Sequence, residues 1–243
     1  MKEKDKQQIG SPHSTNPKAN FWARFIVGAI AVFIIWFFVI RPGSVELSLT
    51  QQEQLLAIAR EQLIASVAGE GSIDVYPPEL SDRVLRDGAA FVSLTVDGAL
   101  RGCMIDEFEP HEPLVANVLH NIQLAVLDDG RFASISEDEI ESVRIKISVV
   151  YDVKTLRFKN SDSLVNKLAP LADGVILTID ETTAAYLPSI WETFEDPAEF
   201  LSQLCIKAGL PADRWRIEPY PTVQTYRVFE FGEPQVQSRP SLR

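Results

Sequence analysis

The dipeptide Asp97-Gly98 stands between two runs of strand-forming residues, Ala90–Val96 and Ala99–Ile105. Glycine readily adopts the positive φ that a two-residue type I′ turn requires, so this dipeptide between such runs predicts a β-hairpin. Because the two strands of a hairpin run in opposite directions, at least part of the fold must be an antiparallel sheet.

A second hairpin and two further strands extend this predicted sheet. The runs Gly174–Ile179 and Ala184–Leu187 predict the hairpin. Alternating residues from Ile145 to Tyr151 and the run Val223–Phe231 predict the two strands. Since the strands come mostly in hairpins, and not singly between helices, the sequence favours an α+β fold with an antiparallel sheet over a doubly wound parallel sheet.

Helices are predicted on the flanks of the sheet. Capping residues and apolar residues at helical spacing mark where they begin and end. They are expected from the capping box Thr50-Gln51-Gln52-Glu53 to Gly69, over Pro113–Leu127, after the capping box Ser136-Glu137-Asp138-Glu139, over Ser161–Leu168, and from the Asp196 cap to Gly209.

The segment Phe21–Ile40 stands apart because nearly all of its residues are apolar. A helix of twenty residues is about 30 Å long, which matches the apolar core of a bilayer. Arg24 lies in its first turn, where the side chain can reach the headgroups, and Pro42-Gly43 stops the helix. We therefore expect residues 21–41 to form one transmembrane signal-anchor helix before the folded domain.

A cleaved signal peptide is the alternative for this segment. Its apolar region would span about 7–15 residues and end at a small-residue cleavage site, whereas this run ends in Val39-Ile40-Arg41-Pro42. Lysines precede the segment, so the positive-inside rule predicts a single-pass membrane protein with a cytoplasmic N-terminus and an extracytoplasmic domain. Residues 1–20 are expected to be a disordered basic tail, and residues 232–243 a loose C-terminal tail.

The rest of the chain is acidic. Six basic and two acidic residues fall among the first 43, so residues 44–243 are more negative than the whole chain, whose formal net charge is −11. A surface of this sign repels the phosphates of DNA and RNA. The charge therefore argues against a nucleic-acid partner.

No pattern in the sequence has the spacing of a metal site. The two cysteines, Cys103 and Cys205, lie far apart, and no histidine belongs to an HExxH pattern. The pair His111-Glu112 lies in a loop flanked by prolines and is expected at the solvated surface. Two cysteines are also too few for a disulfide scaffold.

Three motifs follow one another along the chain. They are Leu100-Arg101-Gly102-Cys103, Asp129-Gly130-Arg131-Phe132, and Leu204-Cys205-Ile206-Lys207-Ala208-Gly209-Leu210. In their order and spacing, the residues from about Leu49 to Phe231 resemble the AMMECR-type domain, named after a human chromosomal region linked to Alport syndrome and midface hypoplasia. We expect residues 46–231 to be this domain. The resemblance implies an antiparallel sheet with flanking helices, built from two related halves.

The resemblance also has implications for partners and for single residues. Family members are often encoded or fused with a Memo-like protein and a radical-SAM protein, which implies a partnership and not a chemistry. Cys205 matches a family position on the last helix, which implies a core residue and not a disulfide partner of Cys103. The chain departs from the family at Ile105, where glycine is usual, and its membrane anchor is additional.

Cys103 is the candidate for an enzymatic role, as nucleophile or redox thiol. On a regular strand Arg101 shares its face, where the guanidinium would lower the thiol pKa, and His120 could act as a base if the fold brings it near. In the alternative interpretation Arg101 pairs with an acid, Gly102 permits tight packing, and Cys103 is a small buried apolar residue.

Binding is the other candidate function. Arg101 and Arg131 could hold a small acidic ligand or partner segment, with Asp129 orienting one guanidinium; the alternative for Asp129 and Arg131 is a salt bridge within a turn. We expect Arg101, Gly102 and Cys103 to border a cleft near this pair.

The favoured function is a membrane-anchored binding or partner module that acts with Memo-like or radical-SAM type proteins. An enzyme that uses Cys103 is the alternative. The sequence identifies neither a cofactor nor a substrate.

Overall fold

The computed structural model describes residues 46–73 and 76–234. The expected basic tail, the expected membrane helix at Phe21–Ile40 and residues 235–243 lie outside the described residues. Within the described ranges, no helix is long and apolar enough to cross a membrane.

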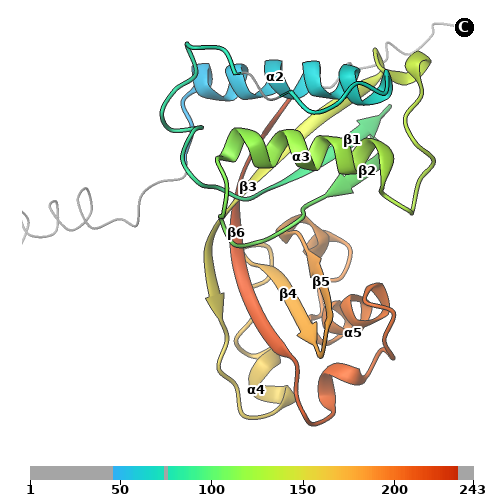
Figure 1. Cartoon of the computed structure of the whole chain (residues 1–243). Coiled ribbons are helices and arrows are strands. Elements are labelled where there is room, and N and C mark those ends of the chain that lie inside the picture. The colour runs from blue at the N-terminus through green and yellow to red at the C-terminus, as the bar shows by residue number, and fades with distance from the viewer. Residues whose placement is uncertain (1–45, 74–75, 235–243) are drawn as a thin grey trace, which may run out of the picture. The chain divides into compact units, whose positions relative to one another are not determined.

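The described chain folds around one six-stranded sheet (Figure 1). Its strands lie in the order β2-β1-β3-β6-β4-β5, and every neighbouring pair is antiparallel, which confirms the predicted α+β class. The edge strands are therefore β2 and β5. The strands are β1 (Ala90–Val96), β2 (Ala99–Met104), β3 (Val143–Thr155), β4 (Gly174–Ile179), β5 (Thr182–Tyr186) and β6 (Thr222–Gly232).

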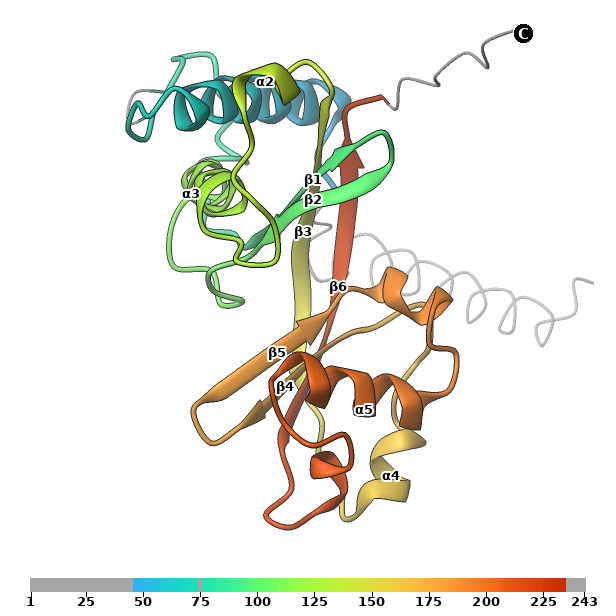
Figure 2. The same ribbon diagram turned by 90° about the vertical axis from the view of Figure 1, so that its right-hand side faces the viewer.

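Helices flank both ends of this sheet, as predicted (Figures 1 and 2). The N-terminal half contains α2, β1, β2 and α3; here α3 covers β1 and β2, and α2 packs on α3. The C-terminal half contains α4, β4, β5 and α5; here α5 packs on β5. The long strands β3 and β6 run through both halves. The helices are α2 (Leu49–Val67), α3 (Leu114–Leu127), α4 (Ser161–Val165) and α5 (Pro197–Lys207), with short 3₁₀ helices η1 (Glu137–Glu139), η2 (Pro188–Glu192) and η3 (Arg214–Arg216).

The start of α2 differs from the prediction. Ser48, and not Thr50, is the N-cap: its hydroxyl accepts the Gln51 N–H at 3.3 Å, and the Gln51 side chain accepts the Ser48 N–H at 2.8 Å. Glutamine serves as well as glutamate at the third position of a capping box. Two overlapping boxes were therefore available in the sequence, and the earlier one caps the helix.

The Asp97-Gly98 turn has the predicted geometry. Both residues have positive φ, 50° and 80°, as a type I′ turn requires, and Val96 pairs directly with Ala99.

Beyond this turn β2 is not a regular strand. Thr95 and Leu94 are neighbours on β1, yet they pair with Leu100 and Gly102, so Arg101 is the extra residue of a β-bulge. A bulge interrupts the alternation of side chains along a strand. The alternation from which we predicted the direction of the Arg101 side chain therefore does not hold.

Apolar clusters fill the space between the sheet and the helices. Alternate residues of β1, Ala90, Val92 and Leu94, are buried in the cluster that α2 and α3 cover. In the C-terminal half, the Phe200 ring stacks on Trp191 with ring centroids 3.8 Å apart. Each half therefore has a core of its own.

A third cluster lies on the opposite face of β1. Phe91 contacts both Tyr226 of β6 and Phe108 of the loop after β2, with ring centroids 5.7–5.9 Å apart in this trio. Residues of both halves take part in it, including Ile176 and Ala185. This cluster joins the two halves and forms the floor beneath the site described next.

The chain between β6 and residue 234 is attached to the domain. The expected loose tail began at residue 232, but Gly232 belongs to β6, and Glu233 accepts a hydrogen bond from the Ile145 N–H at 2.9 Å. Glu233 also pairs with Arg60 of α2.

Candidate functional site

Cys103 lies on edge strand β2 and lines a cavity of about 340 Å³. We refer to it as the Cys103 cavity. Both halves of the domain contribute walls. The lining residues are Phe91, Cys103, Met104, Ile105, Asp106, Phe108 and Arg131 from the N-terminal half, and Thr183, Ala184, Ala185 and Lys207 from the C-terminal half.

Cys103 is partly exposed as a residue and lines this cavity. Ser93 stands opposite it on β1, and the Ser93 hydroxyl donates to the sulfur at 3.2 Å. The second thiol, Cys205, is fully buried in the core of the C-terminal half, as predicted, and both cysteines are free.

Asp129 and Arg131 lie directly beside Cys103. The Asp129 carboxylate accepts the Cys103 N–H at 2.8 Å, and the Arg131 guanidinium donates to the Cys103 carbonyl oxygen at 3.0 Å. Arg131 also donates to both carboxylate oxygens of Asp129, at 2.8 and 2.6 Å. The ion pair therefore takes up both outward-facing backbone groups of Cys103, where a further strand would otherwise pair.

These contacts hold both side chains in their charged forms. Burial alone would raise the pKa of the Asp129 carboxyl, whose side chain is 4% exposed, but hydrogen bonds from Arg131 and the Cys103 N–H outweigh it and lower the pKa. The hydrogen bond to Asp129 raises the pKa of Arg131. Asp129 therefore orients the guanidinium, and the same contact is a salt bridge within a turn.

Asp129 and the Cys103 carbonyl do not use every donor of Arg131. Its Nε and Nη2 atoms bind Asp129 and the Cys103 carbonyl, while neither of these partners takes the two N–H groups of Nη1. About half of the side chain, 48%, is exposed. The guanidinium also interacts electrostatically with the Cys103 thiol.

Arg101 is not among the residues that line the Cys103 cavity. Its guanidinium donates to both carboxylate oxygens of Glu139, at 2.8 and 2.9 Å, and to the Ala133 carbonyl oxygen at 2.8 Å. The hydrogen bond from Arg101 lowers the pKa of Glu139 to about 2. Arg101 therefore pairs with an acid and holds the segment after Arg131 against β2. The bulge at Arg101 interrupts the alternation of side chains, so Arg101 does not share a face with the Cys103 thiol.

Gly102 packs against helix α3. A Cβ atom at this position would overlap the carbonyl oxygen of Ala125. The contact supports the interpretation that Gly102 permits tight packing, and it brings β2 close to α3.

Lys207 was not singled out as a site residue in the sequence. It is the last residue of α5, and its ammonium donates to the Ala185 carbonyl oxygen at 2.7 Å and lies 5.0 Å from the centre of the Tyr186 ring. Withdrawal of the ammonium from water lowers the pKa of Lys207, and the positive charge of Arg131 lowers it further. The cavity thus has a cation from each half of the domain.

Ile105, where the resemblance led us to expect glycine, lines the cavity next to the third apolar cluster. Ile105 is not among the residues with positive φ. Its backbone therefore does not need the conformational freedom of glycine, and its side chain adds apolar surface to the wall.

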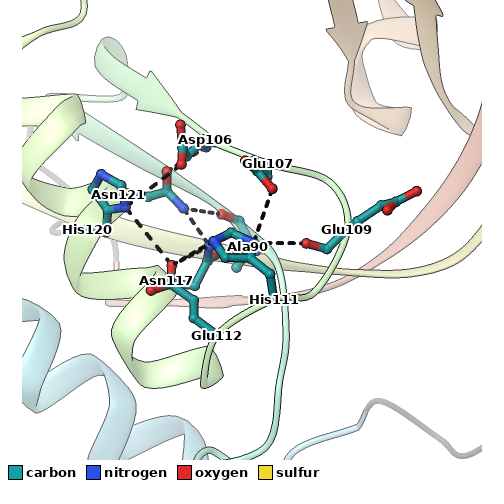
Figure 3. A network of polar contacts seen from close by, with 9 residues as sticks. All are labelled: Ala90, Asp106, Glu107, Glu109, His111, Glu112, Asn117, His120 and Asn121. Atoms are coloured by element: carbon teal, nitrogen blue, oxygen red, sulfur yellow. Dashed lines mark hydrogen bonds and ion pairs between the residues drawn. The ribbon is translucent and has the colours of Figure 1, made fainter.

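A buried polar network fixes the start of β1 to helix α3 (Figure 3). Asn117 and Asn121 are fully buried on α3. The Asn117 amide oxygen accepts the Ala90 N–H at 2.9 Å, while the Asn121 amide donates to the Ala90 carbonyl oxygen at 3.2 Å and accepts the Asp106 N–H at 2.8 Å. The network holds β1 and the loop after β2, which carries Phe108, in one arrangement.

His111 and His120 lie at the surface beside this network (Figure 3). His111 is 3.3 Å from Glu107, and His120 is 4.0 Å from both Asp106 and Glu112. His120 does not line the Cys103 cavity, so its expected role as a base for the thiol has no support in the geometry. Among the described residues, no group of three His, Cys, Asp or Glu side chains is arranged to hold a metal ion.

The arrangement of Asp129, Arg131 and Cys103 on a sheet with these flanking helices agrees with the family resemblance. The sequence model of the AMMECR1 family matches residues 56–231. The chain belongs to the AMMECR1 family. Membership identifies the domain and leaves its activity unassigned.

Archaeal relatives and a solved structure extend this match. The chain is 32% identical over 196 residues to a protein of Methanopyrus kandleri, covering 78% of this chain and 93% of the relative. It is 30% identical over 180 residues to a protein of Nanoarchaeum equitans, covering 72% and 98%. The crystal structure of an uncharacterized protein from Pyrococcus horikoshii is similar, with a TM-score of 0.68, 25% identity, and coverage of 76% of this chain and 92% of that one.

Proposed function

We propose that this AMMECR1-type domain is a binding module whose Cys103 cavity takes a small acidic ligand or the acidic end of a partner segment. The observation that carries the proposal is the pair of cations, Arg131 and Lys207, that two different halves of an acidic chain bring to one cavity. Charge-assisted hydrogen bonds from a fixed guanidinium favour a carboxylate or phosphate.

The other lining residues restrict which anion fits. Phe91, Ile105 and Phe108 supply apolar surface, so a ligand with an apolar part next to its acidic group buries more area than a bare ion. Asp106 also lines the cavity and opposes ligands that carry several negative charges. A small apolar or aromatic carboxylate satisfies these conditions.

Isothermal titration of the purified full-length protein with phenylacetate tests the proposal. We expect saturable binding that Arg131→Ala weakens at least tenfold, and that Arg157→Ala leaves unchanged, because Arg157 is exposed and does not line the cavity. Equal affinity in the Arg131 and Arg157 variants would contradict the proposed site.

The alternative, an enzyme that uses the Cys103 thiol, is favoured by one observation: the only thiol lining this cavity is partly exposed and accepts a hydrogen bond from Ser93. Alkylation of the folded protein with iodoacetamide, followed by peptide mass mapping, tests its accessibility. We expect Cys103 to react and the buried Cys205 to serve as the internal control. An unmodified Cys103 would remove this alternative.

We further propose that Phe21–Ile40 anchors the domain to a membrane, with the N-terminus in the cytoplasm, and that a Memo-like protein is its partner. The length of the apolar segment and the preceding lysines support the anchor, and the family resemblance supports the partner. The acidic charge supports a partner other than a nucleic acid. Retention of full-length protein in alkali-washed membranes supports the anchor, and its release into the soluble fraction contradicts it.

A further inference from the structure

Lys207 differs from the other lysines of the described chain in where its amine lies. Lys146 and Lys154 form ion pairs with Glu230 and Asp152 at the surface. Lys207 has no carboxylate partner among the described residues and lines the Cys103 cavity, where its nitrogen is held by the Ala185 carbonyl. Its side chain therefore borders a space that a ligand can enter. Burial and the charge of Arg131 lower the pKa of Lys207 by more than the charge of Asp129 raises it.

Arg131 belongs to the same cavity and complements this amine. Asp129 fixes the guanidinium through Nε and Nη2, so that Nη1 is not taken by Asp129 or by the Cys103 carbonyl. The cavity thus combines an anion-binding group with a nitrogen nucleophile, and apolar surface from Phe91 and Phe108 lies in the same lining. An amine beside another cation, partly withdrawn from water, is in its neutral and nucleophilic form more often than a surface lysine.

We propose that Lys207 forms an imine with the carbonyl group of a 2-oxo acid whose carboxylate binds Arg131. The inference rests on the proposed function and assigns the ligand class of the same cavity.

The chemistry requires only the two partners. The neutral Lys207 amine adds to the ketone carbon, the nitrogen loses both of its protons, and the carbonyl oxygen leaves as water. A carbon–nitrogen double bond then replaces the carbon–oxygen double bond, without oxidant or reductant. The apolar wall accommodates a hydrocarbon or aromatic side chain on the 2-oxo acid and limits the access of water to the imine.

Reductive trapping of the full-length protein tests the proposal. Phenylpyruvate is added with sodium cyanoborohydride, which converts an imine into a stable secondary amine, and the modified lysine is identified by peptide mass mapping. We expect the adduct at Lys207 to form at least roughly ten times faster than at Lys146, because a carboxylate bound to Arg131 holds the ketone in the cavity that Lys207 lines. Phenylacetate, which has the same carboxylate and ring but no ketone, should slow the reaction at Lys207 and leave Lys146 unaffected.

Two variants complete the test. Lys207→Arg keeps the positive charge and should abolish the adduct, whereas Lys146→Arg should leave it unchanged. If phenylacetate binds and phenylpyruvate modifies Lys207 no faster than Lys146, the imine proposal is overturned while the binding proposal stands. If neither acid binds, both proposals fail.

Discussion

At the scale of single residues, the motif around Cys103 divides into residues that build the site and residues that face it. Arg101 and Gly102 turn toward Glu139 and Ala125, while Cys103 lines the cavity. These three consecutive residues thus serve both the stability of the domain and the candidate site. Substitutions within the motif should separate the two.

Gly102→Ala should destabilise the domain by about 1–3 kcal/mol, because the added methyl group overlaps the Ala125 carbonyl oxygen and must move β2 away from α3. Urea unfolding followed by circular dichroism measures the change. Gly71→Ala is the matched control, since nothing lies within 4 Å of a Cβ atom there. Equal urea midpoints for the two variants would show that β2 can move away from α3 without a loss of stability.

The Arg101–Glu139 pair predicts a dependence on pH. Because the folded-state pKa of Glu139, about 2, lies below its ordinary value of 4.5, its contribution to stability is complete above about 4.5 and is lost as the pH falls toward about 2. Glu139→Gln should therefore be less stable than the parent near neutral pH, and this difference should vanish near pH 2. Melting temperatures across this range test it, with Glu141→Gln as control; a constant difference would contradict the prediction.

The sequence predicted part of this site. Asp129 and Arg131 are two residues apart, so their contact is local and their motif indicated it. The position of Arg101 depends on a bulge in the pairing of β2 with β1, and no local sequence pattern predicts that bulge. Lys207 comes from a distant helix, and only the folded chain brings it to Cys103.

At the scale of elements, the hairpins and helices formed close to where turn and capping residues predicted them, because those signals act within a few residues; α2, with its cap at Ser48, differs by two residues. The Asp196 cap illustrates this: its carboxylate accepts the N–H groups of Ala198 and Glu199, as its place before Pro197 indicated. Helix α3 carries a feature that the apolar pattern did not indicate, namely two fully buried asparagines.

Asn117→Ala should cost about 1–3 kcal/mol, because it leaves the buried Ala90 N–H without its acceptor. Asn166→Ala, at an exposed helix end, should change stability far less. Denaturant titration of both variants gives the comparison. Amide hydrogen exchange at Ala90 should also accelerate in Asn117→Ala alone, and an unchanged rate there would contradict the role of the network.

At the scale of the whole domain, the two halves meet through the third apolar cluster, and strands β3 and β6 run through both. Such long-range packing has no short sequence signal, which is why the C-terminal wall of the cavity was not predicted. The last described residues take part in the same long-range order, since Glu233 binds Arg60 near the start of the domain and the Ile145 N–H.

Glu233→Ala should lower the stability of the domain by about 1–3 kcal/mol, because Arg60 and the Ile145 N–H both lose an acceptor that is largely shielded from water. Glu181→Ala, in the exposed turn between β4 and β5, is the control. Thermal unfolding of both variants measures the effect. If Glu233→Ala unfolds at the same temperature as the parent protein, the contacts of Glu233 do not contribute to the stability of the domain.

The ion pair beside Cys103 has a consequence for solubility. A sheet edge with open hydrogen-bonding groups recruits strands from neighbouring molecules, and proteins suppress this by occupying or covering the edge. Asp129 and Arg131 occupy the Cys103 position of β2, and Lys207 takes the Ala185 carbonyl of β5. Loss of Asp129 would therefore release the Arg131 guanidinium and also leave the Cys103 N–H open to pairing with a strand of another molecule.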